Sequence, residues 1–112
     1  MKNQHFDRVT NLLNQALPRL ASTPRLEFKN CFGAVAGYVN GRIFISCGTF
    51  GVALRLPPDI LDDLFQEKDV QRLRYFPNGH IKREYAVLPD RMVEDKRRVR
   101  KLVEQSIDFA LS

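Results

Sequence analysis

The Asn40-Gly41 dipeptide constrains the fold of this chain more than any other feature of its sequence. It separates two strand-like runs, residues 37–39 and 42–44. A two-residue turn of type I′ needs positive φ at both central positions, and Asn and Gly adopt such φ values at the lowest steric cost. The dipeptide therefore predicts a tight antiparallel hairpin, and with it a sheet whose neighbouring strands are joined by short turns.

The turn also predicts which side chains share a face of the hairpin. In the simple two-residue register, Ala34 opposes Cys47, and alternate residues point to opposite faces. The face that we expect to line the core carries Ala34, Ala36, Tyr38, Ile43, Ile45 and Cys47. The other face carries Val35, Gly37, Val39, Arg42, Phe44 and Ser46. Cys31 and Cys47 fall on opposite faces in this register, so we expect no disulfide between them.

The remaining patterns predict helices around this sheet. Apolar spacing of three and four indicates a helix over residues 6–17, which Pro18 ends, and residues 22–24 read as a loop. A strand over 52–56 precedes a short helix over 60–67. A hairpin over 73–88, bent at 77–80 and bulged, precedes a closing helix capped by Asp95. We predict an α+β fold, a two-layer antiparallel sheet with helices in the order α-β-β-β-α-β-β-α.

Length and composition limit what the chain can be. Its 112 residues fit one domain over residues 1–112. No apolar stretch approaches the roughly 20 residues of a membrane span, and the first residues lack the apolar core of a signal peptide. We therefore expect a cytoplasmic protein without a membrane contact. Two cysteines and two histidines at unrelated positions predict no metal or cofactor site, and no catalytic motif indicates an enzyme.

A net charge of +5 raises the expectation of an anionic partner. The excess of positive charge comes from the hairpin and from the start of the last helix. The candidate anion or nucleic-acid patch consists of Arg72, Arg74, Lys82, Arg83, Lys96, Arg97, Arg100 and Lys101. A solvated helix face is the simpler interpretation of the run at 96–101, and the sequence does not show whether the two groups share one face.

A second candidate surface is the outer face of the first hairpin. If the helices cover only one side of the sheet, Val35, Val39 and Phe44 are exposed there. Exposed apolar groups of this kind usually mark an interface. We expect these three residues to form the contact of a homodimer.

Several motifs follow one another along the chain. They are Lys29-Asn30-Cys31-Phe32-Gly33, then Asn40-Gly41, Phe44, Arg55-Leu56, Tyr75-Phe76, and Tyr85-Ala86-Val87-Leu88-Pro89 before a closing amphipathic helix. In this order they resemble the TfoX N-terminal domain family. The resemblance runs from about residue 6 to residue 111. Cys31, Ala34 and Leu102 depart from the family pattern, which has Met, Gly and often Trp at these places. All three are core-type changes that leave the fold assignment intact.

The resemblance implies a bacterial protein with a fold similar to that of secretion chaperones, which commonly dimerise. It also implies a link to the competence regulator that names the family, although this chain is too short to include that regulator's helical C-terminal domain. It brings no catalytic residues. The function expected from the sequence is thus a non-catalytic interaction or regulatory domain that forms a homodimer and contacts a regulatory partner. The alternative is a nucleic-acid-binding module that uses the basic hairpin and the last helix.

Overall fold

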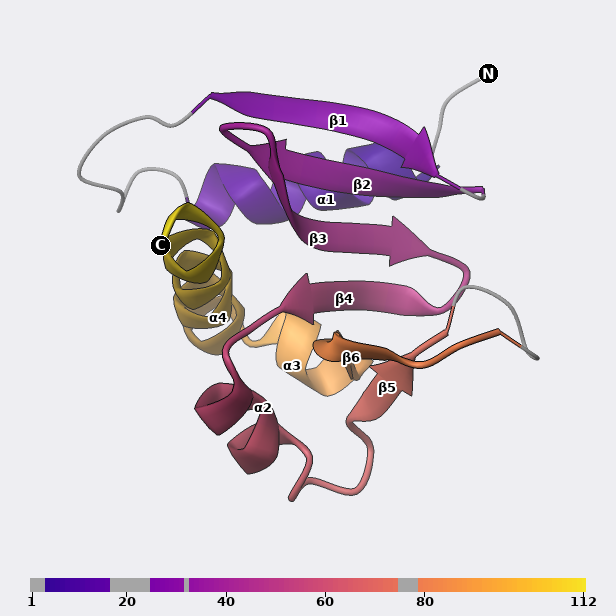
Figure 1. Cartoon of the computed structure of the whole chain (residues 1–112), viewed down its shortest axis with the longest axis vertical. Helices are drawn as coiled ribbons and strands as arrows, with labels where there is room; N and C mark the ends of the chain where they lie inside the picture. The colour runs from indigo at the N-terminus through magenta and orange to yellow at the C-terminus, as the bar shows by residue number, and fades with distance from the viewer. Residues whose placement is uncertain (1–3, 17–24, 32, 75–78) are drawn as a thin grey trace.

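The structure, a computed structural model, describes residues 4–16, 25–31, 33–74 and 79–112. They form a six-stranded antiparallel sheet and four helices. The strands are β1 (Leu26–Cys31), β2 (Ala34–Val39), β3 (Arg42–Gly48), β4 (Gly51–Arg55), β5 (Gln71–Leu73) and β6 (Lys82–Leu88). The helices are α1 (Gln4–Ala16), α2 (Pro58–Leu64), α3 (Asp90–Glu94) and α4 (Lys96–Leu111). The strand order across the sheet is β1-β2-β3-β4-β6-β5 (Figure 1).

The predicted α+β class is confirmed, but the predicted order lacked two elements. Strand β1 separates from β2 at Gly33, whose φ of +79° allows the reversal. Helix α3 has five residues, which is too short to show helical periodicity in the sequence. The predicted loop at 22–24 and residues 77 and 78 of the predicted bend lie outside the described residues.

The local signals for turns and caps are confirmed. Asn40 and Gly41 have φ of 49° and 81°, as a type I′ turn requires. The Asn40 side chain also accepts a hydrogen bond from the Arg25 main-chain N–H at 2.9 Å. At the start of α4, the Asp95 carboxylate accepts a hydrogen bond from the Arg98 N–H at 3.1 Å, which satisfies one of the free donors of that helix.

A β-bulge at Phe44 changes the register that the turn sets. Next to the turn, Tyr38 pairs with Ile43 as predicted, but the following pair is Gly37 with Ile45, so Phe44 has no partner in β2. Cys47 consequently pairs with Val35, and the predicted pairing with Ala34 is wrong. The bulge depends on a glycine, because a Cβ atom at position 37 would lie 2.6 Å from the Ile45 side chain.

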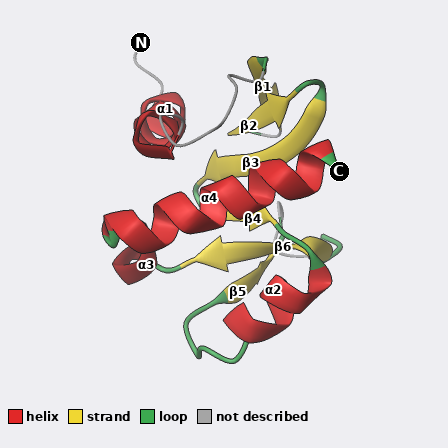
Figure 2. Ribbon diagram, turned by 90° about the vertical axis from the view of Figure 1, so that its left-hand side faces the viewer, coloured by secondary structure: helices red, strands yellow, loops and turns green. Residues whose placement is uncertain are grey.

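The predicted dimer face is buried, and this prediction of exposure is wrong. Val35, Val39 and Phe44 are 2%, 0% and 0% exposed and belong to the main core. Helices α1 and α4 pack against β2 and β3 on this side of the sheet (Figure 2). The bulge brings Ile45 and Cys47 to the same side, where they join this core instead of the face that we predicted for them. Helical cover therefore lies on the face opposite to the predicted one.

The second face of the sheet carries a smaller core. Ala53, Leu73, Tyr85 and Val87 form it, and the half-buried Phe50 packs on its edge. Phe50 also lies over Gly48, where an added Cβ atom would come within 2.8 Å of the ring. On this face, aromatic side chains rather than a helix cover the small residues of the sheet.

Ser106 joins helix α4 to the bulge. Its hydroxyl is fully buried and lies 2.8 Å from the Phe44 carbonyl oxygen and 2.6 Å from the Arg55 carbonyl oxygen. Neither residue has a pairing partner across the β3–β4 ladder, so these carbonyls need another donor. The hydroxyl supplies a single proton that it shares between them, which fixes α4 across the middle of the sheet.

We expect Ser106→Ala to lower the free energy of unfolding by about 1–3 kcal/mol, because two buried carbonyls lose their donor. Urea unfolding followed by circular dichroism measures this change. Asp108→Ala is the matched control on an exposed face of the same helix and should change stability by less than about 0.5 kcal/mol. Equal unfolding midpoints for wild type and Ser106→Ala would show that the hydroxyl does not hold the helix.

Candidate functional site

Two adjoining hollows lie beside the C-terminal half of α4. The larger has a volume of about 660 Å³ and is lined by residues of β3, β4, β6 and α4. The smaller, of about 280 Å³, is lined by residues of α2, β5, β6 and α4, together with Leu56 and Phe65. Glu84 of β6 and Phe109 of α4 line both, so these two side chains stand between the hollows. We call the pair of hollows the α4 groove.

Phe109 is the aromatic centre of the α4 groove. The Arg55 guanidinium lies 4.9 Å from the centroid of its ring, in cation–π geometry. Arg55 Nε also donates a hydrogen bond to Glu84 Oε2 at 2.6 Å. Because these contacts place Arg55 between an aromatic face and a carboxylate, its charge is largely satisfied within the domain.

Arg42 closes the far end of the larger hollow. Its Nη1 atom donates to the Ala110 carbonyl at 3.1 Å and to the Ser112 carbonyl at 2.7 Å. These are carbonyls at the end of α4, where a cation is favoured by the helix dipole. Arg42 therefore acts as a cap that holds the end of α4 against β3.

The arginine side chains of the smaller hollow are less neutralised by internal contacts than those of the larger hollow. The Arg72 guanidinium lies 4.3 Å from the centroid of the Phe65 ring. Arg83 is exposed and, among the residues that the structure describes, has no carboxylate partner. The hollow is floored by apolar groups, Leu61 and Phe109 among them. An anionic group that enters here would meet two guanidinium groups beside an apolar surface.

The structure brings together only part of the predicted basic patch. Arg72 and Arg83 line the same hollow, whereas Arg74 and Lys82 of the hairpin line neither hollow of the groove. The helical group, Lys96, Arg97, Arg100 and Lys101, lies in the first two turns of α4. At 1.5 Å per residue, Lys96 is about 20 Å along the helix axis from Phe109. The helical cations therefore do not line the α4 groove.

Sequence reasoning missed several residues of the groove. Arg42 and Arg55 are separated in sequence from the charge clusters and gave no signal. Phe109 did give one, because it lies next to the inner stripe of α4 rather than in it, and a large apolar residue off the stripe indicates a second contact. Phe65, at the end of α2, packs against the main core only in part.

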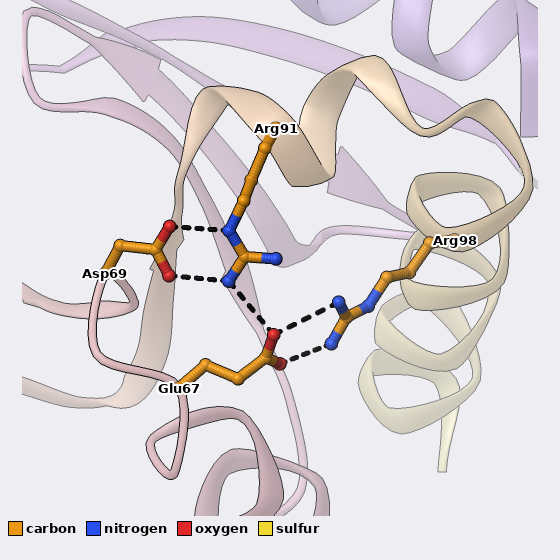
Figure 3. Close-up of polar contacts among 4 residues, drawn as sticks. All are labelled: Glu67, Asp69, Arg91 and Arg98. Carbon is orange, nitrogen blue, oxygen red and sulfur yellow. Dashed lines mark hydrogen bonds and ion pairs between the residues drawn. The ribbon is translucent and has the colours of Figure 1, made fainter.

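A separate set of ion pairs joins the loop after α2 to α3 and α4 (Figure 3). Arg91 binds both oxygens of Asp69 at 2.6 Å and reaches Glu67 at 3.0 Å. Arg98 also binds the Glu67 carboxylate with both of its terminal nitrogens. The Arg98 and Arg91 guanidinium groups lower the pKa of Glu67, and Arg91 lowers that of Asp69. These four side chains neutralise one another and have a structural role.

The described residues offer little reactive chemistry. Cys47 is fully buried, and burial raises the pKa of its thiol to about 12, so the thiolate is not formed at neutral pH. No group of three or more His, Cys, Asp or Glu side chains that could hold a metal ion occurs among them. The helices in the same part of the chain include none that is long and apolar enough to cross a membrane.

The fold and the groove together define a small α+β domain with an arginine- and aromatic-lined surface at the junction of sheet and helices. The family model described as the TfoX N-terminal domain matches residues 19–110. The chain belongs to this family, and the resemblance seen in its motifs is confirmed. Comparison with curated proteins found no match, and comparison with solved structures found none either.

We expect the ion pairs of Glu67 and Asp69 to stabilise the fold in a pH-dependent manner. Because their pKa values are lower in the folded state, the unfolded state binds more protons in acid, and stability falls as the pH drops through the carboxylate range. The difference in Tm between wild type and Glu67→Gln should be largest near about pH 6 and shrink toward about pH 3. Thermal unfolding across this range measures it.

Asp63→Asn provides the control for this titration. Asp63 is an exposed carboxylate of α2 and takes part in no ion pair within the described residues. The Tm of this variant should follow that of the wild type at every pH. If Glu67→Gln and Asp63→Asn lose stability with the same pH profile, the ion pairs do not stabilise the fold.

Proposed function

We propose that this TfoX N-terminal domain is a non-catalytic interaction domain of a cytoplasmic regulatory protein, and that it binds an acidic segment of a protein partner in the α4 groove. The observation that carries the proposal is the pair Arg72 and Arg83 at the smaller hollow. Arg83 is a charge without a carboxylate partner among the described residues, placed beside an apolar floor. A partner segment with a carboxylate next to an apolar side chain would satisfy both.

The charges around the groove favour a protein over a nucleic acid. Asp62 and Glu84 line the same hollow as the two arginines, and Asp59 and Asp63 are exposed on the same helix as Asp62. A phosphate backbone presents closely spaced negative charge, which these carboxylates would repel. A protein segment can instead place single charges opposite each group, which suits a surface of mixed sign.

The interior of the domain supports a non-catalytic role. Its buried polar side chains, Ser46 and Ser106, lie in the sheet and at the bulge rather than in the groove. Two of the charged groups that line the groove, Arg42 and Arg55, are held in internal contacts. Such groups position surfaces, and a guanidinium that is held in this way does not act as a general base. Competence is the first process in which to search for the partner, because the family is named after a competence regulator.

Binding of nucleic acid is the alternative function, and one observation favours it. Lys96, Arg97 and Lys101 are exposed at the start of α4, and none of them forms an ion pair with a described residue. Three such charges on adjacent turns could contact consecutive phosphates. Binding of this kind weakens steeply with salt because counterions are released.

The test uses the whole chain with two probes, an acidic peptide that contains one aromatic residue and a mixed pool of short single-stranded DNA and RNA. Binding is measured by fluorescence anisotropy at low and high salt. We expect the peptide to bind, and Arg83→Glu to weaken this binding at least about tenfold, because an attractive charge becomes repulsive. Lys101→Glu makes the same change in charge on α4, away from the groove, and should leave peptide binding unchanged.

Each outcome decides between the two functions. Equal loss of peptide binding in Arg83→Glu and Lys101→Glu would show only a general charge effect and would refute the groove as the site. Nucleic-acid binding that falls steeply with salt and is abolished when Arg97, Arg100 and Lys101 are replaced by Glu would establish the alternative instead.

A further inference from the structure

The smaller hollow of the α4 groove carries charge of both signs. Arg72 of β5 and Arg83 of β6 line it from the sheet, and Asp62 lines it from α2, which packs against β6. All three are exposed residues. The proposed partner segment uses the two arginines, and it leaves the carboxylate of Asp62 without a role.

Asp62 and Arg83 do not neutralise each other. Neither side chain forms an ion pair with the other, or with any other residue that the structure describes. Glu84 of the same hollow differs, because its carboxylate accepts a hydrogen bond from Arg55 at 2.6 Å. A carboxylate and a guanidinium that line one hollow but stay apart create an electric field across it. A ligand that carries both charges, in the opposite order, is favoured in such a field.

The floor of this hollow is apolar. Leu56 and Leu61 are buried there, and the rings of Phe65 and Phe109 are half-buried beside them. The Arg72 guanidinium lies 4.3 Å from the centroid of the Phe65 ring, which helps to hold this ring in place. An aromatic or other large apolar group that enters the hollow would find rings and aliphatic side chains to contact.

The size of the hollow limits its occupant. Its volume of about 280 Å³ lies just below the range of roughly 300–1,000 Å³ that is typical of pockets for drug-sized ligands. The hollow therefore suits a compound of the size of a single amino acid better than it suits a nucleotide.

We propose that the smaller hollow binds a free α-amino acid with an aromatic or other large apolar side chain. The carboxylate of the ligand contacts Arg72 and Arg83, and its ammonium group contacts Asp62. Its side chain lies against Phe65 and Phe109. In this arrangement each charge of the ligand meets an opposite charge, and its apolar part is removed from water.

Ligands of other classes satisfy the hollow only in part. An acid without an amine leaves Asp62 close to a second negative charge, and a phosphate compound increases this repulsion. An amine without an acid leaves Arg83 unpaired. A peptide chain carries its free ammonium and carboxylate groups at opposite ends, whereas a free amino acid carries both on one carbon atom.

Isothermal titration of the whole chain with L-phenylalanine tests the proposal. We expect saturable binding. Two analogues should bind at least about tenfold more weakly, N-acetyl-L-phenylalanine because it lacks the positive charge and L-phenylalaninamide because it lacks the negative charge. L-alanine has both charges but only a methyl side chain, and it should also bind at least about tenfold more weakly because it leaves the apolar floor uncovered.

Two variants assign the charges of the ligand to residues of the hollow. Arg83→Gln should weaken binding of L-phenylalanine but leave binding of L-phenylalaninamide nearly unchanged, because the amide has no carboxylate to lose a partner. Asp62→Asn should weaken binding of L-phenylalanine but leave binding of the N-acetyl compound nearly unchanged. Asp63→Asn is the matched control, since Asp63 is an exposed carboxylate of the same helix that lines neither hollow. It should leave binding of every ligand unchanged.

Three results would overturn the proposal. The first is the absence of saturable L-phenylalanine binding to the wild type. The second is equal binding of L-phenylalanine and its analogues, which would show that the two charges are not recognised. The third is an equal loss of affinity in Asp62→Asn and Asp63→Asn, which would place the ligand outside this hollow. Circular dichroism establishes that each variant is folded.

This titration contains no peptide, so its outcome is separable from that of the proposed function. A chain that binds the acidic peptide through Arg83 but does not bind L-phenylalanine would retain the proposed function and refute the amino-acid site. The reverse result would refute the proposed function and support the amino-acid site. Because both ligands need Arg83, L-phenylalanine would displace the peptide and thereby regulate binding of the partner, a consequence that rests on the proposed function.

Discussion

The hydroxyl of Ser106 lies between the main-chain carbonyls of Phe44 and Arg55, at the point where β3 bulges away from its neighbours. The bulge directs Phe44 and Ile45 to the same side of the sheet, and it thereby creates a continuous apolar surface on which α4 can lie. Without the bulge, alternation would send Ile45 to the other face. Without the hydroxyl, two carbonyls would be buried beneath a helix with no donor. The position of α4 follows from this single contact region.

The position of α4 in turn determines the shape of the α4 groove. Because the helix is fixed at Ser106, its next turn brings Phe109 over Arg55 and its end to Arg42. Strand β6 places Glu84, the neighbour of Tyr85 that pairs with Arg55, where its carboxylate accepts from Arg55, so the groove is assembled from elements that are distant in sequence. Each internal contact satisfies a charge that would otherwise be free, and the charge that remains at Arg83 stands out for this reason. The candidate site is therefore the part of the groove whose charge the other described residues do not neutralise.

Positive charge in this protein is divided among three tasks. Arg91 and Arg98 bind the carboxylates that tie the loop after α2 to α3 and α4 (Figure 3). Arg42 and Arg55 hold the groove in shape, while Lys29 of β1 lies over the Tyr38 ring. A net charge of +5 therefore does not describe one basic surface. Where the cations lie relative to carboxylates and aromatic rings matters more for recognition than their number.

The sequence by itself determined most of the elements and several of their local ends, but not β1 as a separate strand or α3. Asn40-Gly41, the apolar stripe of α4 and Asp95 act over a few residues, and the α+β class follows from them. Only the tertiary structure decided which face of the hairpin is covered, because a bulge reverses the alternation in β3, and Gly37, which has no Cβ atom, leaves the space that the Ile45 side chain takes. The placement of Val35, Val39 and Phe44 was predicted wrongly for that reason. The groove likewise required long-range packing, since no local pattern reports that Arg55, Glu84 and Phe109 meet.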